Sequence, residues 1–235
     1  MIDVDAVRAA LYEMSGSGRA ARISVAEYGT LRPRLGIRLD ALRDYAQSLV
    51  TTHKHELTLE TVVPLFDALY AGESIEETII AGLMLARLPA IRQTLPLATF
   101  GVWLGQLAGW IEVDSTCQST FTAKDLYARW DEWAAFLRAL NRDENMAKRR
   151  ASLVLLNRTV RESDDQRGIG LALELAASLA PERDKLITKA VSWTLREAAK
   201  LHSTAVGAFI DTHADTLHVS LVREVRTKLA TGKKR

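Results

Sequence analysis

The sequence predicts an all-α fold, a right-handed solenoid built of antiparallel helix pairs. Apolar residues recur at spacings of three and four along almost the whole chain, and little of it alternates as strands do. The 235 residues include only 5 Pro and 13 Gly, which favours long regular elements. The breaks between periodic segments are short, as between antiparallel neighbours. A helical bundle is the competing architecture, but many helices with short links favour stacked pairs.

The periodic segments are expected to form helices over residues 3–14, 39–52, 58–71, 74–88, 96–112, 122–140, 143–162, 165–180, 182–202, 203–213 and 216–230. Ser74 and Glu77 form a capping box at one helix start, and Thr122 precedes a lysine and an aspartate at another. Three further starts are marked by proline, at Pro89, Pro96 and Pro181. Residues 15–38 are rich in glycine and arginine and are expected to form a loop with a short helix at 24–29.

Composition excludes several classes of protein. No apolar run approaches the ~18 residues that a membrane-spanning helix needs. The first residues are acidic, whereas a signal peptide begins with basic ones. The single cysteine, Cys117, rules out a disulfide within the chain and fits a reducing compartment. We therefore expect a cytoplasmic protein that does not bind membranes.

Charge is distributed unevenly along the chain. Residues 1–140 hold 13 Lys and Arg against 17 Asp and Glu, whereas residues 141–235 hold 18 against 12. A basic half of this kind suits binding to nucleic acid through phosphates, although a solvated surface would show the same balance. Residues 1–230 are expected to form a single helical repeat domain, and residues 231–235 a basic disordered tail.

One helix combines an aromatic ring with cations. On the helix expected over 182–202, aliphatic residues from Ile187 to Leu201 form one stripe. The opposite face carries a tryptophan among three cations: Lys189, Trp193, Arg196 and Lys200. This face suits an anionic polymer, with phosphates for the cations and a sugar or base for the ring. The alternative is an indole that fills a groove against a neighbouring helix, with solvated charges around it.

A second tryptophan stands four residues before a carboxylate. Trp103, Trp110 and Asp114 share one stripe of the helix that begins near Pro96. Trp110 and Asp114 would therefore present a ring and a carboxylate to the same point. If that helix ends earlier, Asp114 caps the next element with Ser115 and Thr116 instead.

The third candidate is the basic run Lys148, Arg149 and Arg150. Arg150 is expected to share a helix face with Asn157 and Arg161, where it could hold a phosphate bidentately. A solvated face or an ion-pair partner is the alternative. His53 and His55 have no third ligand at metal spacing, and no phosphate-binding loop or nucleophile motif is present, so neither a metal nor a cofactor is expected.

These stretches together resemble the AlkD-type DNA alkylation repair glycosylases, which are built of HEAT-like helical repeats. The run from Lys189 to Arg196 is similar to the family signature K-A-I/V-x-W-x-L-R, and the separation of Trp110, Asp114 and Arg150 also matches. Leu35 to Arg43 resembles the family segment L-G-V-x-x-P-x-L-R, with aspartate in place of proline. Ser74 to Thr78 departs from the family's His-Glu-x-Arg wording, because the acids are present without the His or the Arg.

The resemblance implies a HEAT-like solenoid with a concave basic face. It also implies a monomer that acts on double-stranded DNA containing alkylated bases, in the cytoplasm and at the nucleoid. It implies excision of cationic N3- or N7-alkylated purines. Asp114 would be the catalytic carboxylate, with Trp110 and Trp193 as aromatic walls against the deoxyribose. The DNA contacts would come from Tyr28, Lys148, Arg149, Arg150, Lys189, Arg196 and Lys200, with Arg149 as the fallback for the phosphate role of Arg150.

Two other functions remain open from the sequence alone. A non-catalytic HEAT-like protein that binds branched or bent DNA needs the basic face but not Asp114. A scaffold that binds a protein partner needs neither of them.

Overall fold

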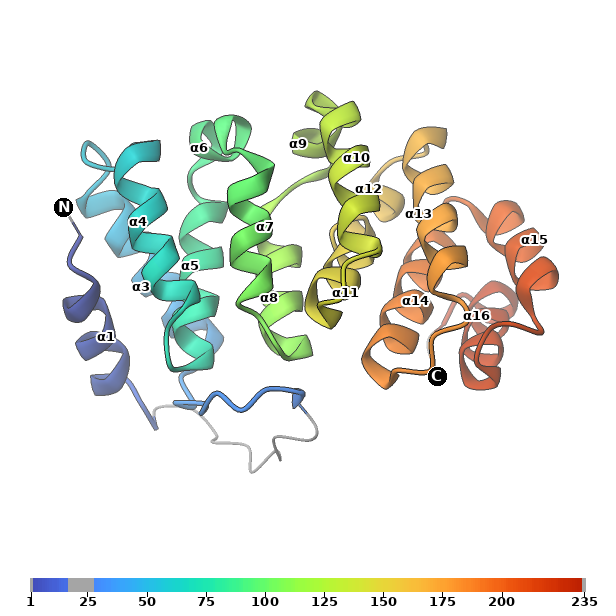
Figure 1. Cartoon of the computed structure of the whole chain (residues 1–235), viewed down its shortest axis with the longest axis horizontal. Helices are drawn as coiled ribbons and strands as arrows, with labels where there is room; N and C mark the ends of the chain where they lie inside the picture. The colour runs from blue at the N-terminus through green and yellow to red at the C-terminus, as the bar shows by residue number, and fades with distance from the viewer. Residues whose placement is uncertain (1, 17–27, 234–235) are drawn as a thin grey trace. The chain divides into compact units, whose positions relative to one another are not determined.

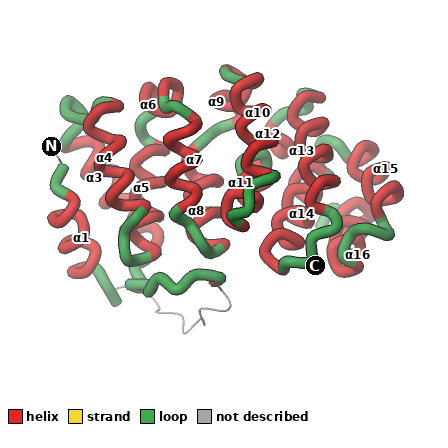
Figure 2. Tube along the Cα trace, viewed as in Figure 1, coloured by secondary structure: helices red, strands yellow, loops and turns green. Residues whose placement is uncertain are grey.

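The computed structural model describes residues 2–16 and 28–233, apart from the side chain of residue 119. Every regular element in these ranges is a helix, and no strand is present among them (Figures 1 and 2). This confirms the all-α prediction. The handedness of the stack and its concave basic face stay predictions. The short helix expected at 24–29 and the end of the basic tail lie largely outside the described residues.

The chain divides into two compact units, Met1–Phe121 and Thr122–Arg235, called unit 1 and unit 2 below. Unit 1 contains α1 (Val4–Glu13), α3 (Leu39–Thr52), α4 (Leu59–Tyr70), α5 (Ile75–Ala86), α6 (Pro89–Thr94), α7 (Leu97–Gly105) and α8 (Trp110–Thr120). Helix α5 is apolar nearly all round and is buried along almost its whole length, against α3, α4 and α8.

Unit 2 follows the same principle, with one central helix and a shell of neighbours. It contains α9 (Ala123–Ala128), α10 (Trp130–Asn141), α11 (Met146–Val154), α12 (Asn157–Glu162), α13 (Gln166–Leu179), α14 (Lys185–Ala198), α15 (Ser203–His213) and α16 (Val219–Thr231). Helix α14 packs against α11, α12, α13 and α16. No helix in the described part of the chain is both long and apolar enough to cross a membrane.

Local signals placed most helix starts correctly. The capping boxes at Ser74 and Thr122 are both formed, and Pro89 occupies the first turn of α6. Pro181 does not start a helix, because α14 begins at Lys185 after Asp184, whose carboxylate accepts hydrogen bonds from two backbone N–H groups.

Three of the expected helices are each divided in two. The segment 96–112 breaks between Gly105 and Trp110, so Trp103 lies on α7 and does not share a helix with Trp110. A Cβ atom at Gly109 would stand 2.3 Å from the carbonyl oxygen of Tyr28, and this close approach of the chain fixes where α8 begins. The segments 122–140 and 143–162 are likewise divided, at Arg129 and after Val154.

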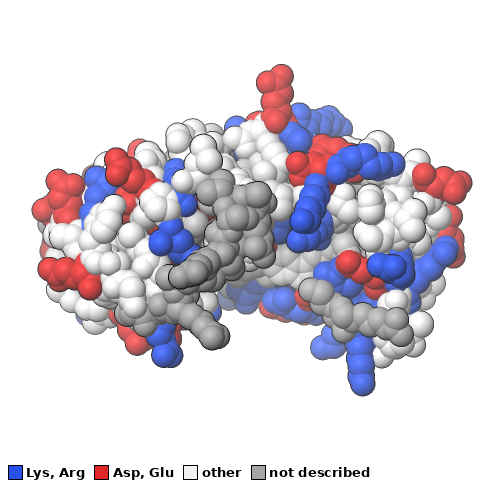
Figure 3. Space-filling model, turned by 90° about the horizontal axis from the view of Figure 1, so that it is seen from below, with Lys and Arg blue, Asp and Glu red and all other residues white. Residues whose placement is uncertain are grey.

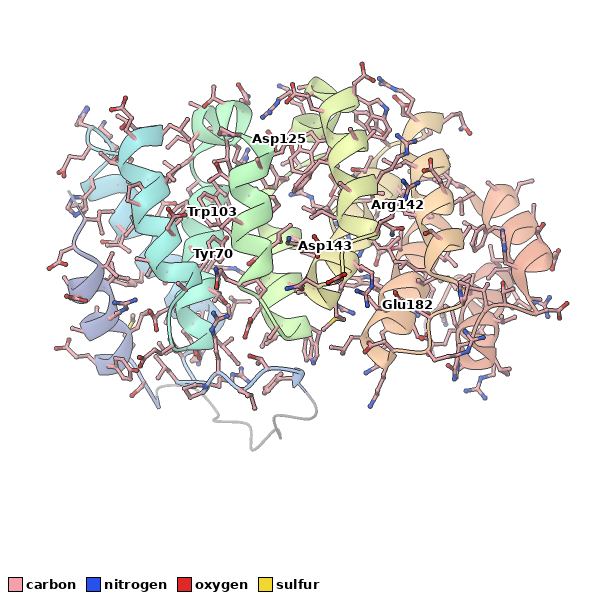
Figure 4. The ribbon with its side chains drawn as sticks, viewed as in Figure 1. Tyr70, Trp103, Asp125, Arg142, Asp143 and Glu182 are labelled. Atoms are coloured by element: carbon pink, nitrogen blue, oxygen red, sulfur yellow. The ribbon has the colours of Figure 1, made fainter. Side chains whose placement is uncertain are left out.

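Trp103 belongs to the core of unit 1. Its ring stacks on Tyr70 with centroids 5.3 Å apart, and its Nε1 donates to Asp67 Oδ1 at 2.6 Å; Tyr70 and Trp103 are labelled in Figure 4. The predicted common face of Trp103, Trp110 and Asp114 was therefore wrong for Trp103, because the two tryptophans lie on different helices.

Candidate functional site

Trp193 lies on the outer face of α14, and its ring is partly exposed. The aliphatic residues of the same helix, from Ile187 to Ala198, are buried against α11 and α12, as the periodicity predicts. Leu201 was wrongly placed in that stripe, since α14 ends at Ala198 and Leu201 is 44% exposed. The two faces of α14 are thus separated as expected, with the indole on the polar one.

Two neighbouring hollows meet at Trp193. Hollow A has a volume of about 350 Å³ and is lined by Arg150, Lys189, Trp193, Arg196 and Glu224. Hollow B has a volume of about 390 Å³ and is lined by Arg161, Trp193, Arg196, Glu197, Lys200 and Lys228. The structure therefore brings together five of the residues selected from the sequence: Arg150, Lys189, Trp193, Arg196 and Lys200.

Glutamates hold the groups around the indole. Trp193 Nε1 donates to Glu197 Oε1 at 2.9 Å, and the other oxygen of Glu197 lies 3.3 Å from Arg161 Nη1. Arg196 forms an ion pair with Glu224 of α16 and donates to the hydroxyl of Ser192, which in turn donates to Glu224 at 2.6 Å. Charge-assisted contacts of this kind fix the orientation of both the ring and the guanidinium.

The three cations of the basic run on α11 have different contacts. Lys148 forms an ion pair with Asp143 at 2.9 Å, and Arg149 forms one with Glu182 at 2.7 Å; both acids are labelled in Figure 4. Arg150 is only 3% exposed, donates to the carbonyl of Leu186, and still lines hollow A. Of the three cations, Arg150 alone lines one of the two hollows.

The face expected for Arg150, Asn157 and Arg161 is only partly present. Arg161 lines hollow B, but Asn157 is fully buried and its Oδ1 accepts from Thr194 Oγ1 at 2.7 Å. The division of the helix before Asn157 changes the phase of the residues that follow, and this turns Asn157 inward.

Unit 2 carries the excess of positive charge. It holds 21 Lys and Arg against 15 Asp and Glu, whereas unit 1 holds 10 against 14. Figure 3 shows Lys and Arg side chains crowded on one face of unit 2, with acidic side chains among them. The charge asymmetry found in the sequence thus follows the boundary between the units.

In unit 1, Trp110 and Asp114 lie one turn apart on α8, and both are partly exposed. The opposite face of α8, with Val113, Thr116 and Cys117, is buried against α5. Asp114 is an interior residue of α8, so the alternative in which it caps the next element was wrong. Trp110 and Asp114 belong to unit 1, whereas Arg150 and Trp193 belong to unit 2.

Tyr28 packs against Trp110. The two ring centroids are 5.7 Å apart, and Tyr28 is only 4% exposed. The guanidinium of Arg34 lies over the Tyr28 ring, 5.7 Å from its centroid, and donates to the Tyr28 hydroxyl. Tyr28 thus contacts Trp110 directly.

Buried carboxylates fix the segment that carries Tyr28. Glu112 of α8 forms an ion pair with Arg32 at 2.9 Å and accepts from the backbone N–H of Ala108 at 2.9 Å. Glu76 accepts hydrogen bonds from the backbone N–H groups of Leu35 and Gly36 at 2.9 and 3.0 Å. Glu76, an acid in the stretch where the sequence departs from the family motif, therefore anchors this segment to α5.

Sequence reasoning missed Arg34, Arg161 and Lys228 as parts of these arrangements. Arg161 was seen only as a neighbour of Arg150, and Lys228 stands in a helix with several other cations. No local signal marks Arg161 and Lys228, because their positions depend on how α12 and α16 pack on α14. Within the described residues, no group of three or more metal-ligating side chains is present.

Comparisons with known proteins identify the family and the fold. The sequence matches a family model described as DNA alkylation repair enzyme over residues 7–229. A solved structure described as a predicted DNA alkylation repair enzyme from Enterococcus faecalis has a similar fold, with a TM-score of 0.70 and 20% sequence identity. The alignment covers 85% of this chain and 90% of that chain. No curated protein matches the sequence.

Proposed function

Because the chain belongs to the DNA alkylation repair enzyme family, we propose that it is a DNA glycosylase. Its substrates are cationic N3- or N7-alkylated purines in double-stranded DNA, and it hydrolyses the N-glycosidic bond that joins the damaged base to deoxyribose. The protein acts as a monomer and uses no metal or cofactor.

The observation that carries the proposal is the partly exposed indole of Trp193, which lines two neighbouring hollows together with cations. Arg150 and Lys189 line hollow A, Lys200 lines hollow B, and Arg196 lines both. Cations bind the phosphates of a DNA strand, and the face of an indole packs against a sugar or base.

The chemistry requires little acid catalysis. A purine alkylated at N3 or N7 already carries a positive charge, so it leaves as a neutral base with the electron pair of the broken bond. The sugar is left with oxocarbenium character, and a water oxygen bonds to C1′ and releases its proton to solvent. The proposed role of Asp114 is to stabilise the cationic sugar electrostatically and to orient that water.

The aromatic residues support the same step. Trp110 lies one turn before Asp114, and its proposed role is to stabilise the cationic sugar with its π face; the same role is proposed for Trp193 of α14. The contact of Tyr28 with one side of Trp110 restricts the orientation of the indole. Arg150 is the proposed phosphate contact, since it lines hollow A whereas Arg149 lines neither hollow.

A base-release assay tests the activity. The protein is incubated with duplex DNA that carries 7-methylguanine, and the free base is measured by chromatography. Release of 7-methylguanine supports the proposal, and no release by the wild type, together with none from DNA carrying 3-methyladenine, refutes it.

The role of Asp114 is tested by Asp114→Asn, with Asp44→Asn as the matched control. Asp44 is an exposed residue of α3 in the same unit, so its substitution removes the same charge elsewhere. We expect Asp114→Asn to lower the rate of base release on the order of 10²–10³-fold, as removal of an electrostatic stabiliser does, with DNA affinity nearly kept. Equal rates in the two variants would show that Asp114 is not catalytic.

DNA binding is tested separately. Lys189→Gln should weaken binding and reduce the slope of log K against log salt by about 1, whereas Lys124→Gln, an exposed cation of α9 outside both hollows, should not. Salt-dependent binding without base release would support the non-catalytic DNA-binding protein. The absence of salt-dependent binding would support the protein-binding scaffold.

A further inference from the structure

We propose that hollow B binds one phosphate of the DNA strand, next to the phosphate held in hollow A. The two hollows would then hold consecutive phosphates on either side of Trp193 and place the indole against the deoxyribose between them. This inference rests on DNA as the substrate in the proposed function. It assigns a binding role to Arg161 and Lys228, which neither the sequence motifs nor the fold singles out.

Charge is the first argument. Four cations line hollow B, and its one carboxylate, Glu197, is already paired with Arg161. Arg196 is paired with Glu224 of hollow A, so hollow B keeps an excess of two positive charges around a volume of about 390 Å³. Such a cluster is unfavourable in the free protein and becomes favourable when an anion enters.

The second argument is the placement of the cations. They come from three helices, with Arg161 on α12, Arg196 on α14 and Lys228 on α16, and Lys200 follows directly after α14. The ammonium of Lys228 is held by the carbonyl of Gly232 at 2.7 Å, and the guanidinium of Arg161 by Glu197. Convergence of cations from separate elements on one hollow is typical of a site for a single anionic group.

The third argument is continuity with hollow A. Trp193 and Arg196 line both hollows, so an anion in hollow B lies next to the same indole as one in hollow A. Lys189 precedes Trp193 by one turn, about 6 Å along α14, and Lys200 follows it. A strand that follows this order presents a phosphate, a sugar and a second phosphate in turn, which favours DNA over an isolated anion.

The experiment compares Lys200→Gln/Lys228→Gln with Arg223→Gln. Arg223 is exposed on α16 and lines neither hollow, so its substitution removes a charge from the same helix outside the proposed site. Binding is measured by fluorescence anisotropy on a duplex with a stable abasic-site analogue. Each phosphate around the analogue is replaced in turn by a neutral methylphosphonate.

In the wild type and in Arg223→Gln, we expect two consecutive phosphates whose neutralisation weakens binding. In the double variant, neutralising one of these two phosphates should no longer weaken binding. In Lys189→Gln, neutralising the other phosphate should no longer weaken binding. Because the double variant loses one phosphate contact, its slope of log K against log salt should fall by about 0.9. Relative to 1 M salt, this corresponds to about an eightfold loss of affinity at 0.1 M salt.

Three results would overturn the inference. In the first, binding by the double variant is still weakened by neutralising either of the two phosphates. In the second, its affinity falls equally whichever phosphate is neutralised. In the third, the slope of log K against log salt falls by about twice the expected amount, which would indicate two separate phosphates. Thermal unfolding of the double variant should match that of Arg223→Gln, since both sets of side chains lie at the surface. Base release is measured independently, so the absence of activity with an intact phosphate pattern would refute the glycosylase proposal and leave this one standing.

Discussion

The buried ion pair between Arg32 and Glu112 should decide the stability of unit 1. Glu112 lies in the first turn of α8, two residues after Trp110, and its carboxylate is completely buried. Arg32 donates to Glu112 Oε2 and to the carbonyls of Gly72 and Tyr70, each at 2.9 Å. Arg32→Met removes all three hydrogen bonds and leaves the carboxylate without its cation.

The magnitude follows from these contacts. An uncompensated buried charge costs about 3–5 kcal/mol, and each lost hydrogen bond to a carbonyl costs roughly 1 kcal/mol more. Arg32→Met should therefore lower the free energy of unfolding by about 5–7 kcal/mol. Glu112→Met should cost about 2–3 kcal/mol, because the guanidinium keeps its two carbonyls and some contact with water. The double variant removes the buried charge altogether and should lose only about 3 kcal/mol.

The decisive outcome is a change of sign. Glu112→Met should destabilise the wild type but stabilise Arg32→Met, as measured by urea unfolding of the full chain followed by circular dichroism. Arg38→Met serves as the control, because Arg38 and Asp40 form an ion pair in the same unit with both side chains exposed, and its loss should leave the unfolding curve unchanged. If the double variant is less stable than Arg32→Met, the carboxylate does not depend on Arg32 and the reasoning fails.

Two further predictions concern acids beside cations in unit 2. Glu224→Gln should raise DNA affinity about two- to fivefold, because it releases Arg196 from its ion pair. The control, Asp211→Asn, breaks the exposed pair with Arg226 outside both hollows and should leave the affinity unchanged. Equal affinities of the two variants, measured by fluorescence anisotropy, would contradict this prediction. Hydrogen bonds from the Lys148 ammonium and the backbone of Asn145 hold the pKa of Asp143 below its ordinary value. The Asp143 carboxylate therefore stabilises the folded protein above the unfolded pKa of about 4, and this stabilisation is lost as pH falls through the lower folded pKa. Asp143→Asn should thus cost about 0.5 kcal/mol at pH 7 and nothing in strong acid, and an equal loss at both pH values in urea unfolding would speak against the ion pair.

Much of the fold could be predicted because its signals are local. Apolar periodicity defined α3 and α13 nearly to the residue, and the capping boxes at Ser74 and Thr122 placed two starts. The divisions within 96–112 and 143–162 could not be predicted in this way. The first lies where Gly109 approaches Tyr28, and the second turns Asn157 inward to Thr194; both contacts join segments far apart in the sequence.

The same distinction applies to the candidate site. The face of Lys189, Trp193 and Arg196 lies within one helix, so the spacing alone placed its members together. The other cations of hollow B come from α12 and α16, and their contribution becomes visible only when these helices pack on α14. The periodicity also treated Trp103 as a neighbour of Trp110, since it carries no information about where a helix is interrupted.

The two glutamates beside Trp193 have different tasks. Six cations line the two hollows, and in the free protein their mutual repulsion is reduced by Glu197 and Glu224 alone among the lining residues. Glu224 is 48% exposed, so in the proposed complex a phosphate would replace it at Arg196 and the released carboxylate would return to water at little cost. Glu197 is 25% exposed and holds the indole N–H as well as Arg161, so its displacement would free the ring. If DNA binds as proposed, a strand gains most by displacing Glu224 and keeping Glu197, because the indole then keeps its orientation toward the sugar.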